Sequence, residues 1–250
     1  MPEYDSFAGF YDRLYDFLTD DIPFYTELAK EAKGPVCELA CGTGRVLLPL
    51  ARAGINMTGL ELSQPMLDVL QSKLDLEPRE LQARVALKCA DMREYRFSTQ
   101  FKLVFCAFNS FLHLMTTDDQ LACLRSVREY LAPDGLLCIK LFAPFHDRLA
   151  KVNEVEDEAR DDGTLVRIFS KRNMAEQTIA TTFVVDTTGP DGLVRRQSTS
   201  PTLCWIHHRE MHLLLRLAGY EVVHAWGGYD KRPYDYVSGS QIFIARSNPA

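Results

Sequence analysis

The chain has 250 residues, of which 46% are hydrophobic and 25% charged, and a formal net charge of −6 with both signs interspersed. This length fits one large domain, or a core with an insertion, and is sufficient to bury a substantial hydrophobic core. The acidic balance disfavours a nucleic-acid partner, and without a long apolar run or a basic, apolar leader we expect a cytoplasmic protein that does not enter the membrane.

The first part of the chain is predicted to be helical. Aromatic and leucine side chains recur at helical spacing over residues 6–32. Pro23 opens a second helix, and Gly34-Pro35 ends it, because proline suits a first helical turn and glycine a helix end.

Short apolar runs and amphipathic segments alternate through the next hundred residues. Alternation at this spacing favours a doubly wound, mostly parallel sheet with helices on both faces, an α/β fold. Strands are predicted at 36–40, 56–61, 84–89, 101–107 and 135–142, with helices at 43–53, 64–75 and 117–131.

The regular alternation stops after Phe142. Residues 146–163 are charged without an apolar period and predict a mobile loop. Strand-like runs follow at 164–171, 178–187 and 193–203, with a strong turn at Gly189-Pro-Asp-Gly192 between the last two, which indicates an antiparallel insertion. A helix at 208–218 and strands at 221–227 and 241–246 complete the chain.

A glycine turn between the first predicted strand and helix is the most informative local feature. Glu38 precedes Gly42 and Gly44, and Glu61 ends the second strand, which is the outline of a βαβ unit that binds a nucleoside. NAD, a nucleotide and S-adenosylmethionine (SAM) all fit this outline. Leu47 stands where the NAD fingerprint needs its third glycine, no phosphate-loop motif is present, and an acid at Glu38 opposes a pyrophosphate.

Three acids follow predicted strand ends and are expected at one edge of the sheet. Glu38, Glu61 and Asp91 would then converge on the ligand crevice of an open α/β sheet. Their combined charge suits a cationic, adenosyl-containing ligand better than an anionic one.

The segment Glu38-Leu-Ala-Cys-Gly-Thr-Gly44 resembles the E/D-x-G-x-G-x-G signature of class I SAM-dependent methyltransferases, with Ala40 in place of the first glycine. Cys89-Ala-Asp91-Met92, Phe108-Asn-Ser-Phe-Leu-His113 and Leu131-Ala-Pro-Asp-Gly135 resemble later segments of that family. The likeness extends to small-molecule N-, O- and C-methyltransferases with an antiparallel lid. It implies SAM as cofactor, S-adenosylhomocysteine as product, and a Rossmann-like seven-stranded sheet whose last strand is antiparallel.

The resemblance also implies a domain organisation and roles for particular residues. Residues 1–34 would form a helical cap, 35–145 the SAM-binding core, 146–207 a lid over the substrate, and 208–250 the end of the core sheet. The expected cofactor-binding residues are Tyr11, Glu38, Ala40, Gly42, Gly44, Arg45, Glu61, Leu62, Met66, Asp91, Met92, Phe108 and Asn109. The expected acceptor-binding residues are Tyr15, Phe142, Trp205 and His207.

His113 is the candidate catalytic base, because it follows the fourth strand and imidazole titrates near neutral pH. A hydroxyl acceptor would need such a base, whereas an amine would need little beyond loss of its proton. His208 and His212 stand four residues apart, but the metalloprotease pattern is missing and the seven cysteines include no C-x-x-C pair, so no metal is expected.

The predicted function is methyl transfer from SAM to nitrogen or oxygen of a small molecule, by a monomer or homodimer. Two alternatives stay open at this point. One is a methyltransferase that modifies protein or RNA, and the other is a non-catalytic subunit that has kept the SAM-binding fold.

Overall fold

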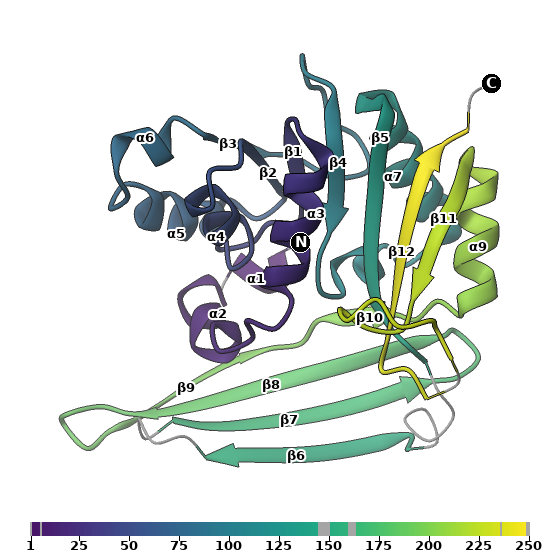
Figure 1. The fold of residues 1–250 in the computed structure, drawn as a ribbon. Coiled ribbons are helices and arrows are strands. Elements are labelled where there is room, and N and C mark those ends of the chain that lie inside the picture. Colours follow the sequence, from purple (N-terminus) through teal and green to yellow (C-terminus); the bar gives the residue numbers. More distant parts are fainter. Residues whose placement is uncertain (1, 6, 145–150, 160–163, 236, 249–250) are drawn as a thin grey trace.

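The computed structural model describes residues 2–5, 7–144, 151–159, 164–235 and 237–248. A seven-stranded sheet forms its centre, with helices on both faces and a second, antiparallel sheet beneath one end (Figure 1). Within the described residues, no helix is both long enough and apolar enough to cross a membrane.

The central sheet has the strand order β11-β12-β5-β4-β1-β2-β3. Neighbouring strands from β5 to β3 pair in parallel, whereas β12 runs antiparallel to both β5 and β11. This arrangement confirms the expected α/β fold with an antiparallel last strand. The strands are β1 (Val36–Leu39), β2 (Met57–Glu61), β3 (Val85–Cys89), β4 (Phe101–Cys106), β5 (Leu131–Phe142), β11 (Tyr220–Trp226) and β12 (Ser240–Ser247).

Each face of the central sheet buries its own hydrophobic cluster. Along β4, Leu103 and Phe105 join one cluster while Val104 and Cys106 join the other, as the alternation of strand side chains requires. The first cluster is covered by α3 (Ile22–Ala32), α4 (Leu47–Arg52) and α5 (Gln64–Leu74). The second is covered by α7 (Thr117–Tyr130) and α9 (His208–Leu217). Two short helical segments, α6 (Arg79–Gln82) and η1 (Ser110–His113), complete the core.

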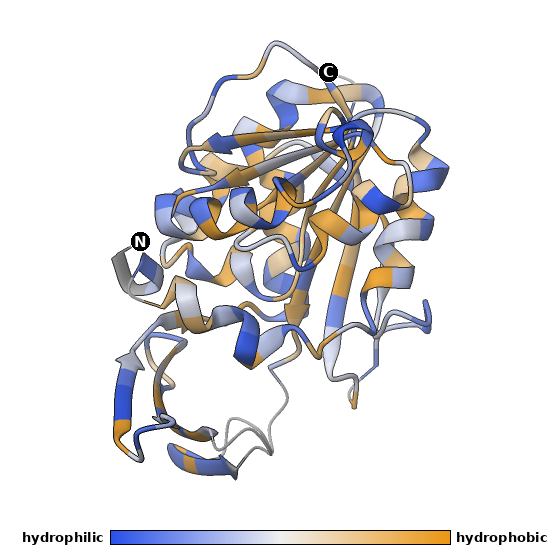
Figure 2. Ribbon diagram, turned by 90° about the vertical axis from the view of Figure 1, so that its left-hand side faces the viewer, coloured by the Kyte–Doolittle hydropathy of each residue, from blue (hydrophilic) through white to orange (hydrophobic). Residues whose placement is uncertain are grey.

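The expected antiparallel insertion is present as a separate sheet in the order β10-β8-β7-β6, with β9 paired to β8. Its strands are β6 (Asn153–Ala159), β7 (Thr164–Asn173), β8 (Thr178–Thr188), β9 (Val194–Thr199) and β10 (Thr202–Cys204). Figure 2 shows blue and orange mixed along this sheet, whereas orange gathers in the central sheet. We call these five strands the lid sheet.

Two details of the insertion differ from the sequence prediction. Residues 153–159 form strand β6 and are not a loop, so that prediction was wrong there; 146–150 and 160–163 lie outside the described residues. The backbone of β6 pairs with β7 along its whole length, although its acidic side chains lack an apolar period. The predicted strand 193–203 is two strands, because Pro201 has no amide hydrogen for the sheet.

The N-terminal helices α1 (Pro2–Asp5) and α2 (Ala8–Tyr15) lie between the core and the lid sheet (Figure 1). Phe7 and Leu14 are buried against Val166 and Val185 of the lid sheet. On the other side, Asp12 accepts a hydrogen bond from Thr43 at 2.5 Å and pairs with Lys73 at 2.6 Å. The helical segment therefore joins the two sheets.

Candidate cofactor and acceptor site

A cavity of about 580 Å³ lies where the carboxyl edge of the central sheet faces α2 and the lid sheet. The segments that follow β1, β2, β3 and β4 all contribute to its wall, as expected for the ligand crevice of an open α/β sheet. The predicted residues that line it are Tyr11, Tyr15, Ala40, Gly42, Glu61, Leu62, Met66, Asp91, Met92, Phe108, Asn109, His113, Phe142 and Trp205.

The two motif glycines have different surroundings. Both adopt positive φ angles, +54° at Gly42 and +86° at Gly44. A Cβ on Gly42 would meet only Met66 Cε at 3.7 Å, so the backbone there is open toward the cavity. A Cβ on Gly44 would overlap Leu70 Cδ1, and Gly44 does not line the cavity. Gly42 thus permits close approach of a ligand, whereas Gly44 permits close packing of α5.

Two other residues of the cavity wall hold the left-handed backbone conformation that normally favours glycine. Ala40 has a φ of +54° and Phe108 a φ of +57°, and both line the cavity. Ala40 therefore takes the conformation of the glycine it replaces in the family signature. Such backbone strain costs about 1–2 kcal/mol per residue and tends to gather at functional sites.

The Glu61 carboxylate connects the glycine turn to the end of β2. Its Oε2 accepts from the Gly42 amide at 3.0 Å, and its Oε1 accepts from the amides of Leu62 and Ser63, both at 2.9 Å. Burial raises the pKa of Glu61, and these three backbone hydrogen bonds oppose the rise. A carboxylate fixed in this way presents its lone pairs at a defined position in the cavity wall.

Glu38 and Arg45 lie behind the cavity wall and do not line it. Glu38 is buried, its Oε2 has no hydrogen-bond partner among the described residues, and burial raises its pKa well above the usual range. Arg45 binds both carboxylate oxygens of Asp21, at 2.7 and 2.6 Å, and its guanidinium lies 5.8 Å from the Phe108 ring centroid. In this structure Arg45 connects the glycine turn to the N-terminal helical segment.

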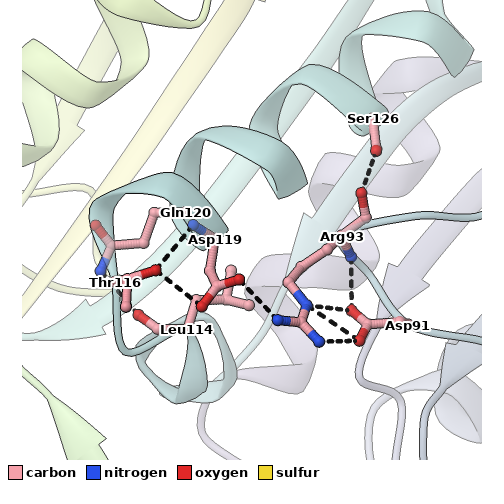
Figure 3. A network of polar contacts seen from close by, with 7 residues as sticks. All are labelled: Asp91, Arg93, Leu114, Thr116, Asp119, Gln120 and Ser126. Carbon is pink, nitrogen blue, oxygen red and sulfur yellow. Dashed lines mark hydrogen bonds and ion pairs between the residues drawn. The ribbon is translucent and has the colours of Figure 1, made fainter.

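Asp91 is held by an arginine that the sequence analysis did not single out (Figure 3). Arg93 Nη2 lies 2.7 Å from Asp91 Oδ2, and its Nη1 lies 2.7 Å from Asp119 Oδ1 at the start of α7. Burial raises the pKa of Asp91, but the hydrogen bonds from Arg93 together outweigh burial and lower it. The sequence signal that could have indicated this ion pair is an arginine two residues after the motif aspartate.

His113, the last residue of η1, lines the cavity. Its Nε2 lies 3.2 Å from the Tyr4 hydroxyl, and its buried Nδ1 has no partner in the described part of the chain. Burial lowers the pKa of His113 to about 4. The imidazole is therefore neutral at physiological pH.

Aromatic side chains form much of the remaining wall. The Tyr15 ring lies 4.8 Å from Tyr11, 5.5 Å from Phe108 and 6.5 Å from Phe183 of the lid sheet, measured between centroids. Burial raises the pKa of Tyr11, which remains protonated at neutral pH. His207 stands outside this wall, because it is the exposed residue that precedes α9.

The lid sheet contributes cavity residues that sequence reasoning missed, among them Glu154, Glu156, Arg172 and Phe183. Alternation along the predicted strands could have indicated which face they occupy, but not what that face covers. His208 and His212 face each other at 3.2 Å between their Nε2 atoms. Among the described residues, no group of three or more histidine, cysteine or acidic side chains could hold a metal ion.

Comparison with known proteins shows similarity to methyltransferases. A profile described as "Methyltransferase domain" matches residues 36–135. The chain is 33% identical over 144 residues to a putative methyltransferase, YqeM, of Bacillus subtilis, an alignment that spans 56% of that relative. It is 27% identical to the cypemycin N-terminal methyltransferase of a Streptomyces species, over 84% of this chain and 81% of the relative. The structure of the CcbJ methyltransferase from Streptomyces caelestis superimposes with a TM-score of 0.82, at 28% identity, covering 92% of this chain and 90% of that one.

In sequence motifs and fold the chain is similar to class I SAM-dependent methyltransferases, and these matches support a methyltransferase that uses SAM as its cofactor. These matches support methylation of nitrogen or oxygen in a small molecule. The cavity fits the cofactor on its own evidence, because an open backbone at Gly42, a fixed carboxylate at Glu61 and an acidic wall suit a cationic nucleoside.

Proposed function

We propose that this methyltransferase transfers the methyl group of SAM to an amine nitrogen of a small molecule. The observation that carries the proposal is the burial of His113, the imidazole predicted as a base, whose Nε2 is taken up by the Tyr4 hydroxyl at 3.2 Å. With a pKa near 4 it is a poor base for a hydroxyl. An amine in its neutral form is already a nucleophile and needs only to be positioned.

SAM, when bound, would supply a methyl group on a positively charged sulfur. The nitrogen lone pair would form the C–N bond as the C–S bond breaks, and the electrons of the C–S bond would stay on sulfur. The protein has to align the nitrogen with the methyl group and exclude water. Such positioning accounts for roughly 7–11 kcal/mol in well-oriented reactions. Tyr15, Phe108 and Phe142, all in the cavity wall, would provide the apolar surroundings.

We assign the cofactor-facing part of the wall by its position at the sheet edge. Glu61 would accept hydrogen bonds from the ribose hydroxyls, and Asp91, held by Arg93, would face the adenine together with Met92. The opening at Gly42 would admit the methionine part of the cofactor, with Tyr11 near its carboxylate. Glu38, Gly44 and Arg45 would act by shaping the turn, since they do not line the cavity.

The proposed organisation follows the same geometry. Residues 146–207 would cover the acceptor, residues 1–34 would close the cofactor side, and 35–145 with 208–250 would form the core. A cavity roofed by the lid sheet suits a small acceptor better than folded RNA or protein. We propose a cytoplasmic enzyme that works as a monomer or homodimer, without nucleic acid.

The test is a transfer assay with labelled SAM and paired amine and hydroxyl acceptors of the same skeleton, read by mass spectrometry. Methylated amine with unmodified hydroxyl supports the proposal. Methylation confined to the hydroxyl would contradict it. Binding of SAM with no transfer to any acceptor would favour the non-catalytic alternative, and loss of labelled product after ribonuclease treatment would favour RNA.

A further inference from the structure

The indole N–H of Trp205 is a buried hydrogen-bond donor that the fold leaves unused. Trp205 is 2% exposed and lines the cavity, and its Nε1 has no partner among the described residues. The backbone of the same residue is engaged on both sides, since its amide donates to Gln177 O at 2.8 Å and its carbonyl accepts from Gln177 Nε2 at 3.2 Å. A buried donor without a partner is uncommon in proteins and calls for a ligand or an ordered water.

Trp205 shares its stretch of the cavity wall with His113. It directly follows Cys204, the last residue of β10, whose Sγ lies 3.3 Å from Leu112 O and 3.4 Å from Leu114 O. These two leucines flank His113 in η1, so one thiol contact brings both cavity residues together. His113 Nδ1 is buried and also lacks a partner in the described part of the chain. Two unused polar atoms therefore belong to neighbouring parts of one wall.

The charged side chains around the cavity favour an uncharged group at these two atoms. Arg93 and Arg172 are the lysine or arginine side chains among the described residues that line the cavity. Both already bind carboxylates, Arg93 those of Asp91 and Asp119 and Arg172 that of Glu154. A carboxylate or phosphate on the acceptor would therefore find no free counter-ion in this part of the wall.

A hydroxyl group suits both atoms, whichever ring nitrogen of the neutral His113 carries the proton. The indole N–H only donates, so the ligand atom that meets it must accept. His113 Nδ1 accepts if Nε2 donates to the Tyr4 oxygen, and it donates if the Tyr4 hydroxyl donates to Nε2. A hydroxyl can do both, whereas a carbonyl or ether oxygen only accepts.

Building on the proposed N-methylation, we infer that the acceptor is an amino alcohol, and that Trp205 selects it by donating its indole N–H to the hydroxyl oxygen. His113 Nδ1 is the second partner of that hydroxyl. Leu114 and Leu203 line the same part of the cavity, and a hydrogen bond in apolar surroundings is stronger than one in water. An amine without the hydroxyl leaves the indole N–H unpaired.

The test compares matched amines bound to protein saturated with S-adenosylhomocysteine, measured by ligand-observed NMR titration. 2-Phenylethylamine is the reference. Phenylalaninol adds a hydroxymethyl group at the carbon that bears the amine, 2-amino-1-phenylethanol adds a hydroxyl at the carbon that bears the ring, and phenylalanine adds a carboxylate. We expect at least one amino alcohol to bind roughly 3- to 10-fold more tightly than the reference, as one neutral hydrogen bond provides, and phenylalanine to bind least.

The contact itself can be observed, because the chain has only two tryptophans. In isotope-labelled protein each indole gives one N–H signal, and Trp226→Phe removes one signal and so assigns the other to Trp205. The tighter amino alcohol should move the Trp205 proton signal downfield, as a new hydrogen bond does, and 2-phenylethylamine should not. This measurement uses the unmodified Trp205 and does not depend on how well a variant at that position folds.

Trp205→Phe keeps an aromatic ring but removes the donor. It should abolish the preference for the amino alcohol and leave binding of 2-phenylethylamine largely unchanged. Trp226→Phe is the matched control, because Trp226 packs against Phe24 and His224 and does not line the cavity. The preference for the amino alcohol should persist in this control.

Equal binding of the amines, or a preference that survives Trp205→Phe, would overturn the inference. So would a Trp205 signal that stays in place while an amino alcohol binds, because an ordered water would then hold the N–H. These results would leave N-methylation intact, since binding is measured without methyl transfer. Transfer from labelled SAM to the oxygen of the amino alcohol would instead refute N-methylation, whatever the affinities are.

Discussion

Replacing Glu61 by glutamine tests the central assignment of the cofactor site. The substitution keeps the size of the side chain but changes one of its two acceptor oxygens into a donor. Glu61 uses both oxygens, Oε1 for the amides of Leu62 and Ser63 and Oε2 for the amide of Gly42. Glutamine can keep its oxygen on the side of two amides, so the Gly42 amide is the one expected to lose its acceptor.

The size of the effect on folding follows from that one bond. A hydrogen bond to a charged group contributes about 1.5–3 kcal/mol, and removing a buried charge returns part of it, since burial raises the pKa of Glu61 and so disfavours the carboxylate. We expect a net loss of about 1–2 kcal/mol in the free energy of unfolding. For a domain of this size each kcal/mol lowers Tm by about 2–4 °C. Unchanged stability of the unliganded Glu61→Gln protein would contradict this expectation.

The effect on the cofactor is separate and can be measured by calorimetry. Loss of about one ribose hydrogen bond should weaken binding of both SAM and S-adenosylhomocysteine roughly 10- to 150-fold. Turnover at saturating SAM should change little, because the ribose contact is the same in the ground and transition states. Glu129→Gln, an exposed residue on α7, is the control and should change neither quantity. Wild-type affinity in a folded Glu61→Gln protein would refute the ribose assignment.

Three further substitutions have distinct expected outcomes. Ala40→Gly should raise the free energy of unfolding by about 1 kcal/mol, because it relieves a φ of +54°, and a Tm that falls or stays constant would contradict this. Gly44→Ala should lower the free energy of unfolding by about 2–4 kcal/mol, because its φ of +86° strains an alanine and the added Cβ overlaps Leu70. Gly54→Ala is the control, since Gly54 has a φ of +87° but no atom within 4 Å of the added Cβ, so it should show the backbone strain alone. Equal losses in the two variants would exclude a contribution from the overlap. The pKa of His113 lies near 4 in the folded protein, below its ordinary value of 6.5, so the unfolded chain binds more protons between these values. The free energy of unfolding should therefore fall by up to about 3 kcal/mol as pH drops from 6.5 to 4. His113→Gln should abolish that part of the pH dependence, as measured by chemical denaturation. The same substitution should slow amine methylation less than about tenfold.

The sequence by itself determined the central fold and the cofactor. Alternating strand and helix patterns predicted the parallel sheet, and Glu38, Gly42, Gly44 and Glu61 identified the βαβ unit, because strand period, glycine turns and strand-end acids are all local properties. Local patterns also predicted three runs of the lid sheet. They failed at β6 (residues 153–159), since pairing along an edge strand depends on the neighbouring backbone and not on an apolar period.

Only the tertiary structure decided which predicted residues share a wall. Arg45 and His207 carried plausible roles in sequence, but one binds Asp21 behind the cavity and the other lies exposed before α9. The low pKa of His113 likewise comes from burial beside Tyr4, more than a hundred positions away in the chain. The acceptor side depends on the same kind of information, because Phe183 of the lid sheet meets Tyr15 of α2 only through the packing of the two elements. Charge balance, burial and ring contacts are sums over neighbours that folding brings together, and a linear pattern does not contain them.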